Sequence, residues 1–141
     1  MQFRARIAVA VGMATLCLSG LSAVPATAAE LGTQATYACN VTSTGTAPGD
    51  KYYAGYYSGN TVQPSSTSVS AAGKEAQCLL KYLGYSPGTV DGIFGSDSQA
   101  AAKKFQARIN ELCGKKVLDV DGKVGPKTWP HLRDVYKCWV G

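Results

Sequence analysis

The carboxylates that could work as a pair in this chain lie in two nearly identical stretches. Residues 90–96 read VDGIFGS and residues 120–126 read VDGKVGP. Asp91 and Asp121 are the only symmetric pair of acids, and a glycosidase needs two carboxylates that flank a cleft. Turns favour the same residue types, because Asp bonds amides two residues further on and Gly accepts positive φ angles. We therefore expect both aspartates to shape turns that lead into helices, and we predict no proton transfer by this pair.

Ion binding by these turns is the next alternative. A calcium loop needs several oxygen donors at alternating positions and a distal bidentate Glu, but residues 119–122 provide two donors and no such Glu. A phosphate cradle combines backbone amides with a lysine. VDGIFGS has no lysine, and the charge of Asp91 would repel phosphate. The sequence predicts neither ion at the turns.

The remaining groups with catalytic chemistry are one histidine and the cysteines. His131 is the only histidine, so a zinc site with two histidines is excluded. The cysteines show no C-x-x-C spacing of the kind that indicates a zinc cluster. The sequence identifies no catalytic partner for His131. We therefore expect no metal, no cofactor and no enzymatic activity.

The first 28 residues have the features of a secretory signal peptide. Arg4 and Arg6 precede an uncharged apolar run, and the A-x-A of residues 26–28 has the spacing that signal peptidase recognises. A membrane anchor is the alternative, disfavoured because two glycines interrupt the run and the cleavage pattern follows it directly. No later segment is apolar enough to span a bilayer. Cleavage would remove two arginines and lower the net charge from +5 to +3.

Four cysteines remain after this cleavage: Cys39, Cys78, Cys113 and Cys138. An even number in a short exported chain indicates two disulfides, and four cysteines allow three pairings. We favour Cys39–Cys78, because it would tie the N-terminal part of the chain to the helices that follow. We favour Cys113–Cys138, because each of these residues ends a predicted helix that follows a VDG-x-x-G turn.

Residues 29–70 and 71–141 differ in composition and define two parts of the mature chain. In the first part, alternating apolar residues and the aromatic run KYYAGYY predict a β-hairpin that pairs residues 35–43 with 51–58, followed by a Ser/Thr-rich linker. A lone hairpin is marginally stable in water, so we expect it to dock on the second part.

Three helical patterns follow in the second part. The first ends at Gly84, a natural helix stop. The second begins at Ser96, for which an S-x-x-Q pattern with Gln99 predicts a capping box. The third begins at Pro126, with a distorted start expected at Pro130. The predicted inward-facing residues are Ala76, Leu79, Leu80 and Leu83, then Ala102, Phe105, Ile109 and Leu112, then Trp129, Leu132, Val135 or Tyr136, and Trp139.

The two turns and the helices after them form an internal repeat. The aligned pairs are Asp91 with Asp121, Gly92 with Gly122, Gly95 with Gly125, and Ser98 with Thr128. The repeated unit is a turn together with the helix start and its first apolar face, so it is a supersecondary unit.

These residues resemble the peptidoglycan-binding domain family of bacterial and phage cell-wall hydrolases, over about residues 74–133. The shared pattern comprises Gln77 and Leu83-Gly84-Tyr85 in the first helix, Asp91 to Ser96 with Ser98, the AAKKFQ of residues 101–106, and the second turn up to Trp129 and Leu132. The chain departs from the family pattern at Ala76, at Pro130 and in the long exit of the second helix, residues 107–114.

The resemblance implies a mainly α fold, a compact three-helix bundle with a shallow groove that holds cell-wall glycan or stem peptide. We expect this bundle to contain the DG-x-x-G repeat and to follow a small disulfide-tied β-hairpin. The family's usual role is anchoring, not catalysis. We place the ligand at Tyr85, Asp91, Phe94, Ser96, Ser98 and Trp129.

The sequence thus predicts a secreted, monomeric, non-catalytic protein that is associated with the cell wall and does not contact the membrane after signal cleavage. Nucleic acid is excluded, because a charge of +3 is small and no arginine cluster is present. The alternative is a secreted protein-binding factor, an inhibitor or partner of a separate wall hydrolase, with the hairpin as its contact surface.

Overall fold

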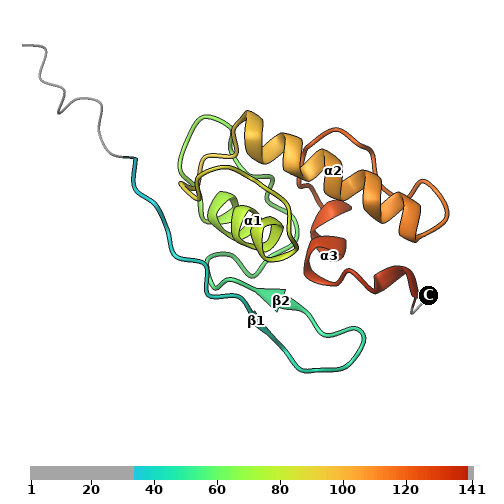
Figure 1. The fold of residues 1–141 in the computed structure, drawn as a ribbon. Helices are drawn as coiled ribbons and strands as arrows, with labels where there is room; N and C mark the ends of the chain where they lie inside the picture. The colour runs from blue at the N-terminus through green and yellow to red at the C-terminus, as the bar shows by residue number, and fades with distance from the viewer. Residues whose placement is uncertain (1–33, 140–141) are drawn as a thin grey trace, which may run out of the picture. The chain divides into compact units, whose positions relative to one another are not determined.

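The structure, a computed structural model, describes residues 34–139 (Figure 1). The elements are β1 (Thr42–Ser43), β2 (Tyr52–Tyr53), α1 (Ala71–Tyr82), α2 (Ser96–Leu112), α3 (Thr128–Arg133) and the 3-10 helix η2 (Lys137–Trp139). The predicted class is confirmed: the described chain is mainly helical and carries a small antiparallel hairpin tied by the Cys39–Cys78 disulfide. The predicted signal peptide of residues 1–28 lies outside the described residues.

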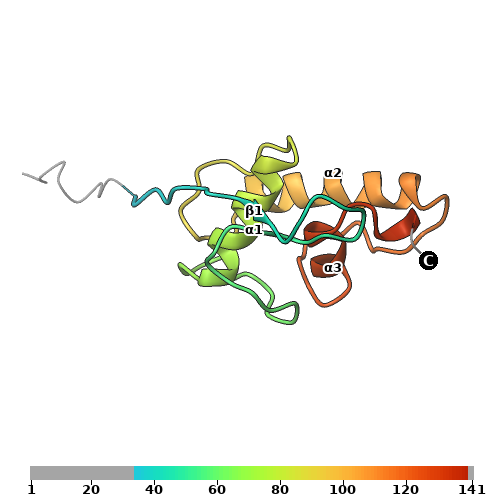
Figure 2. The ribbon, with the colours of Figure 1, turned by 90° about the horizontal axis from the view of Figure 1, so that it is seen from below.

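The helices share one apolar core. Both α2 and α3 pack against α1 (Figures 1 and 2). The centre of the core consists of predicted inward-facing residues that are at most 1% exposed: Ala76, Leu79, Leu80, Ala102, Phe105, Ile109, Trp129 and Leu132. The sequence predicts that either Val135 or Tyr136 faces inward. Val135 packs at the edge of the core, whereas Tyr136 is 53% exposed, so Val135 is the inward-facing residue. The side chain of Trp139 is outside the described part.

The hairpin is present, but it is much shorter than the predicted pairing of residues 35–43 with 51–58. Within the described chain, two residues of each strand pair in antiparallel register. Beyond them the backbone amides bond a side chain instead, because the Glu75 carboxylate accepts hydrogen bonds at 2.9–3.2 Å from the amides of Ala54, Tyr56 and Tyr57. A carboxylate that collects these amides satisfies them without a strand partner, so the ladder ends early.

The first helix ends where its sequence predicts, and its start is capped by a serine. Ser70 is the N-cap of α1, and its hydroxyl accepts a hydrogen bond of 2.9 Å from the amide of Gly73. At the other end, Gly84 adopts a φ of +87°, which lets the chain leave the helix and places the Tyr85 amide 2.9 Å from the Leu80 carbonyl.

The capping box predicted at the start of α2 is wrong. Ser96 is the first helical residue, and Gly95 is the N-cap without a side-chain hydrogen bond. Because the chain enters the helix one residue early, the Ser96 hydroxyl no longer occupies the capping position. The side-chain amide of Gln99 donates to the Phe94 carbonyl at 3.0 Å instead.

The third helix is shorter than predicted. It begins at Thr128, two residues after Pro126, and it ends at Arg133. Asp134 then adopts an extended conformation, and its carboxylate accepts a hydrogen bond of 2.9 Å from the Tyr136 amide. This local bond competes with continuation of the helix, as short acidic side chains commonly do.

Two disulfides join the pairs that the sequence favours. The Cα atoms are 5.2 Å apart in Cys39–Cys78 and 5.1 Å apart in Cys113–Cys138, within the usual range. Cys78 is fully buried in α1, so the first bridge fastens the N-terminal extension to the bundle. The second bridge connects the end of α2 to η2.

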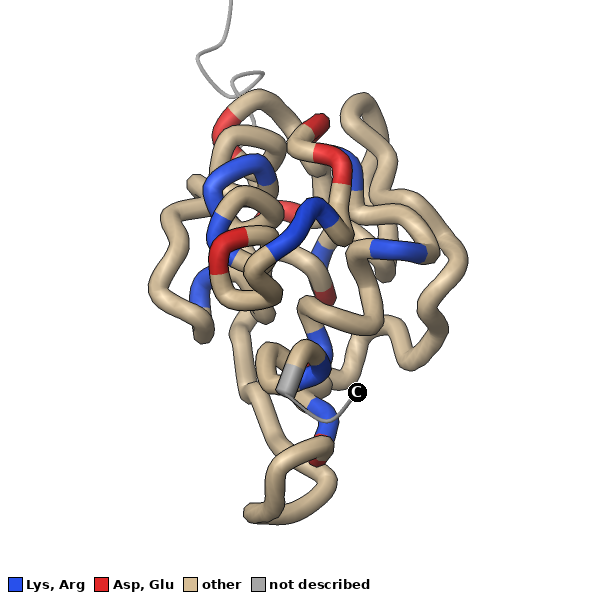
Figure 3. The backbone as a smooth tube through the Cα atoms, turned by 90° about the vertical axis from the view of Figure 1, so that its right-hand side faces the viewer, with Lys and Arg blue, Asp and Glu red and all other residues tan. Residues whose placement is uncertain are grey.

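Charged residues are distributed over the described chain and do not form a single patch. Figure 3 shows Lys and Arg on several elements, with Asp and Glu between them. Among the helices of residues 34–139, none has the length and apolar character needed to span a bilayer.

Candidate functional site

A glutamine of α1 holds the first VDG-x-x-G turn. Gln77 is 1% exposed, and its side-chain oxygen accepts a hydrogen bond of 2.8 Å from the Gly92 amide. Its side-chain nitrogen lies 3.0–3.1 Å from four acceptors that share the two N–H groups: the Asp91 carboxylate, the Ser98 hydroxyl and the carbonyls of Thr89 and Ile93. One buried amide therefore fixes the turn and the first turn of α2 together.

A glutamine of α2 holds the second turn with matching bonds. The Gln106 oxygen accepts from the Gly122 amide at 2.9 Å. The Gln106 nitrogen lies 3.0–3.2 Å from acceptors that correspond to three of those at the first turn: the Asp121 carboxylate, the Lys123 carbonyl and the Thr128 hydroxyl. Each helix thus supplies the residue that shapes the turn leading to the next helix.

Within each turn the aspartate completes the same local structure. The Asp91 carboxylate accepts from the Ile93 amide and that of Asp121 from the Lys123 amide, both at 2.8 Å. Such bonds to an amide two residues on are typical of Asx turns. Both carboxylates are therefore used to build turns, as the sequence analysis expects.

A hollow of about 240 Å³ lies at the start of α2. Three of the predicted ligand residues line it, Asp91, Ser96 and Ser98, and its other lining residues are Gln34, Pro87, Gly88, Thr89, Gly95 and Asp97. Ser96 and Asp97 are exposed, whereas Ser98 is 2% exposed and donates its hydroxyl hydrogen to the Pro87 carbonyl at 2.8 Å. Ser96 and Asp97 thus present an exposed hydroxyl and an exposed carboxylate to this hollow, which the exposed Gln34 and Thr89 also line.

An equivalent hollow of about 310 Å³ lies at the start of α3. Its lining includes the residues that align with those of the first hollow, with a different charge: Asp119, Asp121, Lys123, Gly125, Pro126, Lys127 and Thr128, joined by Gln63 of the linker. Lys127 takes the place of Asp97. The first hollow is therefore acidic and the second carries charges of both signs.

A third hollow of about 380 Å³ separates the two turns. One side is formed by Phe94 and Gln99, the opposite side by Gly122, Lys123 and Val124, and the third by linker residues 63–66. The N-terminal extension therefore contributes to the surface around both turns.

The other predicted ligand residues lie elsewhere. Phe94 is 2% exposed, and Trp129 is fully buried with its indole nitrogen donating to the Val62 carbonyl at 2.8 Å. Tyr85 is half-buried and packs edge-on against Phe105, with ring centroids 5.7 Å apart. Burial raises the pKa of its hydroxyl above the ordinary 10.0, so the group stays neutral. The structure therefore groups Asp91, Ser96 and Ser98, and separates them from the three aromatic residues.

Gln77, Gln106 and Asp97 are absent from the predicted site. The signal for Gln106 was available, because Gln106 precedes Asp121 by 15 residues and Gln77 precedes Asp91 by 14. An alignment of the repeats that started at the preceding helix would have paired the two glutamines.

Comparison with known proteins finds a family match over the helices that hold the two turns. Residues 69–132, which contain α1, α2 and both turns, match the family described as "Putative peptidoglycan binding domain". The chain is also 32% identical over 124 residues to "Uncharacterized protein in bpoA1 3'region" of Kitasatospora aureofaciens, which covers 87% of this chain and 86% of that protein. No solved structure matches the chain significantly. Residues 69–132 of this chain therefore form a domain of the peptidoglycan-binding family.

Proposed function

We propose that this protein is secreted and binds the peptidoglycan of a cell wall without catalysing a reaction. The observation that carries the proposal is the family match over residues 69–132, which coincides with the two glutamine-held turns. The matched residues contain α1, α2 and both turns, and the extension packs on this unit through β2, which contacts α1 and α3.

The proposed ligand surface is the hollow at the first turn. Ser96 and Asp97 offer a free hydroxyl and a free carboxylate, which suit the hydroxyl and amide groups of glycan or stem peptide. Asp91 and Ser98 hold the backbone of this hollow in place, whereas Phe94 and Trp129 are buried in the core and do not line it.

The proposed absence of catalysis rests on how the acids are used. Asp91 and Asp121 each accept hydrogen bonds from a glutamine and from a backbone amide through Oδ1, so both carboxylates serve to build the turns. A turbidity assay on a cell-wall suspension should show no loss of scattering with the oxidised protein.

Retention on purified sacculi tests the proposed function. The mature, oxidised chain of residues 29–141 is mixed with sacculi, which are then sedimented at low salt. We expect the protein in the pellet, and release of part of it as salt rises, because exposed lysines contribute screened attraction to anionic wall polymers. Protein that stays in the supernatant at low salt contradicts the proposal.

A partner protein is the second candidate, favoured by one exposed aromatic surface. Tyr82 and Tyr136 are 55% and 53% exposed, and both neighbour Tyr52 of the hairpin. Tyrosines of this kind are enriched at protein interfaces. The four tyrosines of YYAGYY are themselves half-buried against the bundle, so the hairpin serves first as a packing element. A chain that ignores sacculi but binds a purified wall hydrolase would favour this candidate.

A further inference from the structure

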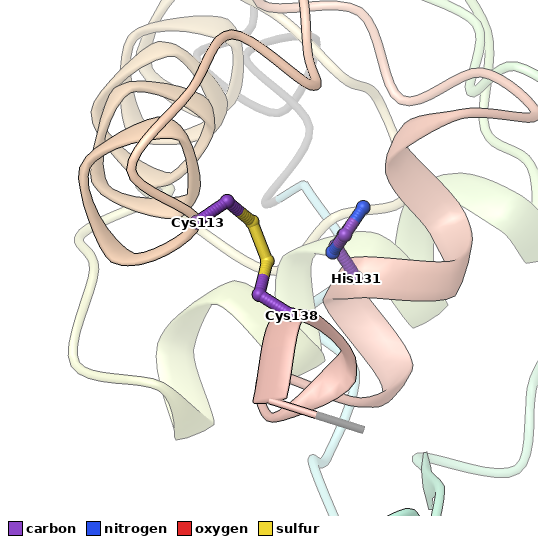
Figure 4. A group of neighbouring side chains, drawn as sticks. All are labelled: Cys113, His131 and Cys138. Atoms are coloured by element: carbon purple, nitrogen blue, oxygen red, sulfur yellow. A yellow bond between two sulfur atoms is a disulfide. The ribbon is translucent and has the colours of Figure 1, made fainter. Parts of the chain in front are cut away.

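Three side chains that are distant in sequence meet at one end of the bundle. Cys113 follows α2, His131 lies in α3 and Cys138 lies in η2 (Figure 4). Their ligand atoms, two sulfurs and one imidazole nitrogen, lie within 4.8 Å of one another. The sulfurs are joined as a disulfide in this structure. The sequence predicted no metal site because no two of these residues have a metal-ligand spacing along the chain.

One nitrogen of the His131 imidazole takes no part in the hydrogen bonds of the described fold. Nδ1 of His131 is buried and has no hydrogen-bond partner among the described residues. Buried polar atoms nearly always have a partner, so an unpartnered one calls for an explanation. The ring lies beside the disulfide (Figure 4), where a metal ion held by the two sulfurs would supply the missing partner.

This disulfide is accessible to small molecules. A hollow of about 280 Å³ is lined by Cys113, His131 and Cys138 together with Lys115, Val117 and Lys137. Both cysteines are partly exposed, in contrast to the fully buried Cys78 of the other bridge. Reduction of the bridge would release two cysteines, and two thiolates would neutralise the charge of a divalent ion.

We propose that Cys113, His131 and Cys138 form a Zn²⁺ site in the reduced chain, so that metal binding and disulfide closure exclude each other. A small thiol supplies the electrons: two RSH molecules reduce the disulfide to two cysteine thiols and leave joined as RSSR. Zn²⁺ then replaces the two thiol protons, and the imidazole nitrogen becomes the third protein ligand.

The donor set determines the choice of metal. Two thiolates and one imidazole suit Zn²⁺, whereas Mg²⁺ and Ca²⁺ prefer oxygen ligands. A water molecule from the hollow would complete the tetrahedron. The hollow beside this disulfide shares no lining residue with the three hollows at the turns, so the proposal does not rest on peptidoglycan binding.

Cobalt titration tests the site directly. The mature chain is reduced with a small dithiol until two thiols are free, and alkylation with peptide mass analysis confirms that these are Cys113 and Cys138. After anaerobic removal of the dithiol, we expect one Co²⁺ per chain with thiolate-to-cobalt absorption, which Zn²⁺ then displaces. The oxidised chain should give no such absorption.

Two variants distinguish a residue that binds the metal from one that only lines the hollow. His131→Asn keeps both cysteines, and we expect it to weaken Co²⁺ binding by at least about tenfold, the loss that removal of an outer-shell partner alone can cause. Lys137→Ala, which changes another residue of the same hollow, should bind Co²⁺ at least as well as the parent. Equal affinity of the parent and His131→Asn overturns the role of the imidazole.

Thermal unfolding covers the case in which the reduced chain is unstable. Zn²⁺ should raise the Tm of the reduced chain, because it binds the folded form, and should leave the oxidised chain unchanged. A reduced chain that gives no thiolate-to-cobalt absorption, or whose Tm or folded fraction Zn²⁺ does not raise, contradicts the proposal.

Discussion

The carboxylate of Glu75 in α1 and the guanidinium of Arg133 in α3 form an ion pair of 2.9 Å in which the side chains are 0% and 1% exposed. The N-terminal extension provides further hydrogen-bond partners for both groups. Glu75 accepts its amides, and Arg133 donates to the Asn60 side chain and to the carbonyls of Tyr52, Tyr57 and Gly59. The extension is thus built into the bundle through one buried ion pair.

Neutralising one partner of this pair should be severely destabilising. Glu75→Gln leaves the Arg133 charge buried without a counter-charge, and we expect a loss of about 3–5 kcal/mol in the free energy of unfolding, measured with denaturant. The matched control is Glu111→Gln, which removes the exposed pair with Arg108 and should cost less than about 1 kcal/mol. Equal effects of the two variants would contradict the structural role of the buried pair.

The two glutamines should differ in function although they are alike in structure. Gln77→Ala and Gln106→Ala each leave buried turn amides without an acceptor, so each should lower stability by about 1–3 kcal/mol. Gln77→Ala should also weaken binding to sacculi, because it releases the first turn, whereas Gln106→Ala should leave binding nearly intact. Thr67→Ala, at an exposed position of the linker that lines none of the three hollows at the turns, is the control for both measurements. Similar binding losses for the two glutamine variants would show that the second turn is also part of the site.

The glycine that follows each aspartate should resist substitution. Gly122 has a φ of +76°, and a Cβ there would lie 2.7 Å from the Gln99 backbone carbonyl. We expect Gly122→Ala to destabilise the fold by roughly 1–3 kcal/mol. Gly125 is the control in the same turn, since a Cβ there meets nothing within 4 Å, and Gly125→Ala should change stability by less than about 0.5 kcal/mol. Thermal or chemical unfolding compares the pair, and a tolerated Gly122→Ala would be inconsistent with the described turn.

Stability of the oxidised chain should fall in mild acid partly through His131. Burial lowers the pKa of this imidazole below the ordinary 6.5, and the charge of Lys137 lowers it further. Below about pH 6.5 the unfolded chain therefore binds a proton that the folded chain does not yet bind, and stability decreases until the pH reaches the folded-state pKa. His131→Asn should reduce the stability difference between neutral and mildly acidic solution. An unchanged pH profile in this variant would argue against the buried neutral imidazole.

Much of the fold follows from local sequence patterns. The apolar stripes predict α1 and α2, and Gly84 predicts where α1 ends, because these features depend on neighbours a few residues apart. The short hairpin and short α3 were not predictable in this way. The hairpin ends where Glu75, some 20 residues away in sequence, takes its amides, and no period-two pattern encodes that contact.

The candidate site also combines features that local sequence patterns predict with features that depend on distant contacts. The repeated VDG-x-x-G identified the turns and their aspartates, while the burial of Phe94 and Trp129 depends on how the linker crosses the bundle. An aromatic residue at the edge of a turn has the same sequence signature whether it faces a ligand or the core. The meeting of Cys113, His131 and Cys138 likewise depends on the packing of three separate elements.

The central claim is that the hollow at the first turn binds peptidoglycan, and the most direct measurement is the affinity of matched variants for purified sacculi. Ser96→Tyr fills the exposed side of this hollow, while Thr67→Tyr places the same side chain at an exposed linker position that lines none of the three hollows at the turns. We predict that Ser96→Tyr weakens binding at least tenfold, about 1.4 kcal/mol, and that Thr67→Tyr binds like the parent chain. Equal affinity of all three folded proteins would contradict this location of the site.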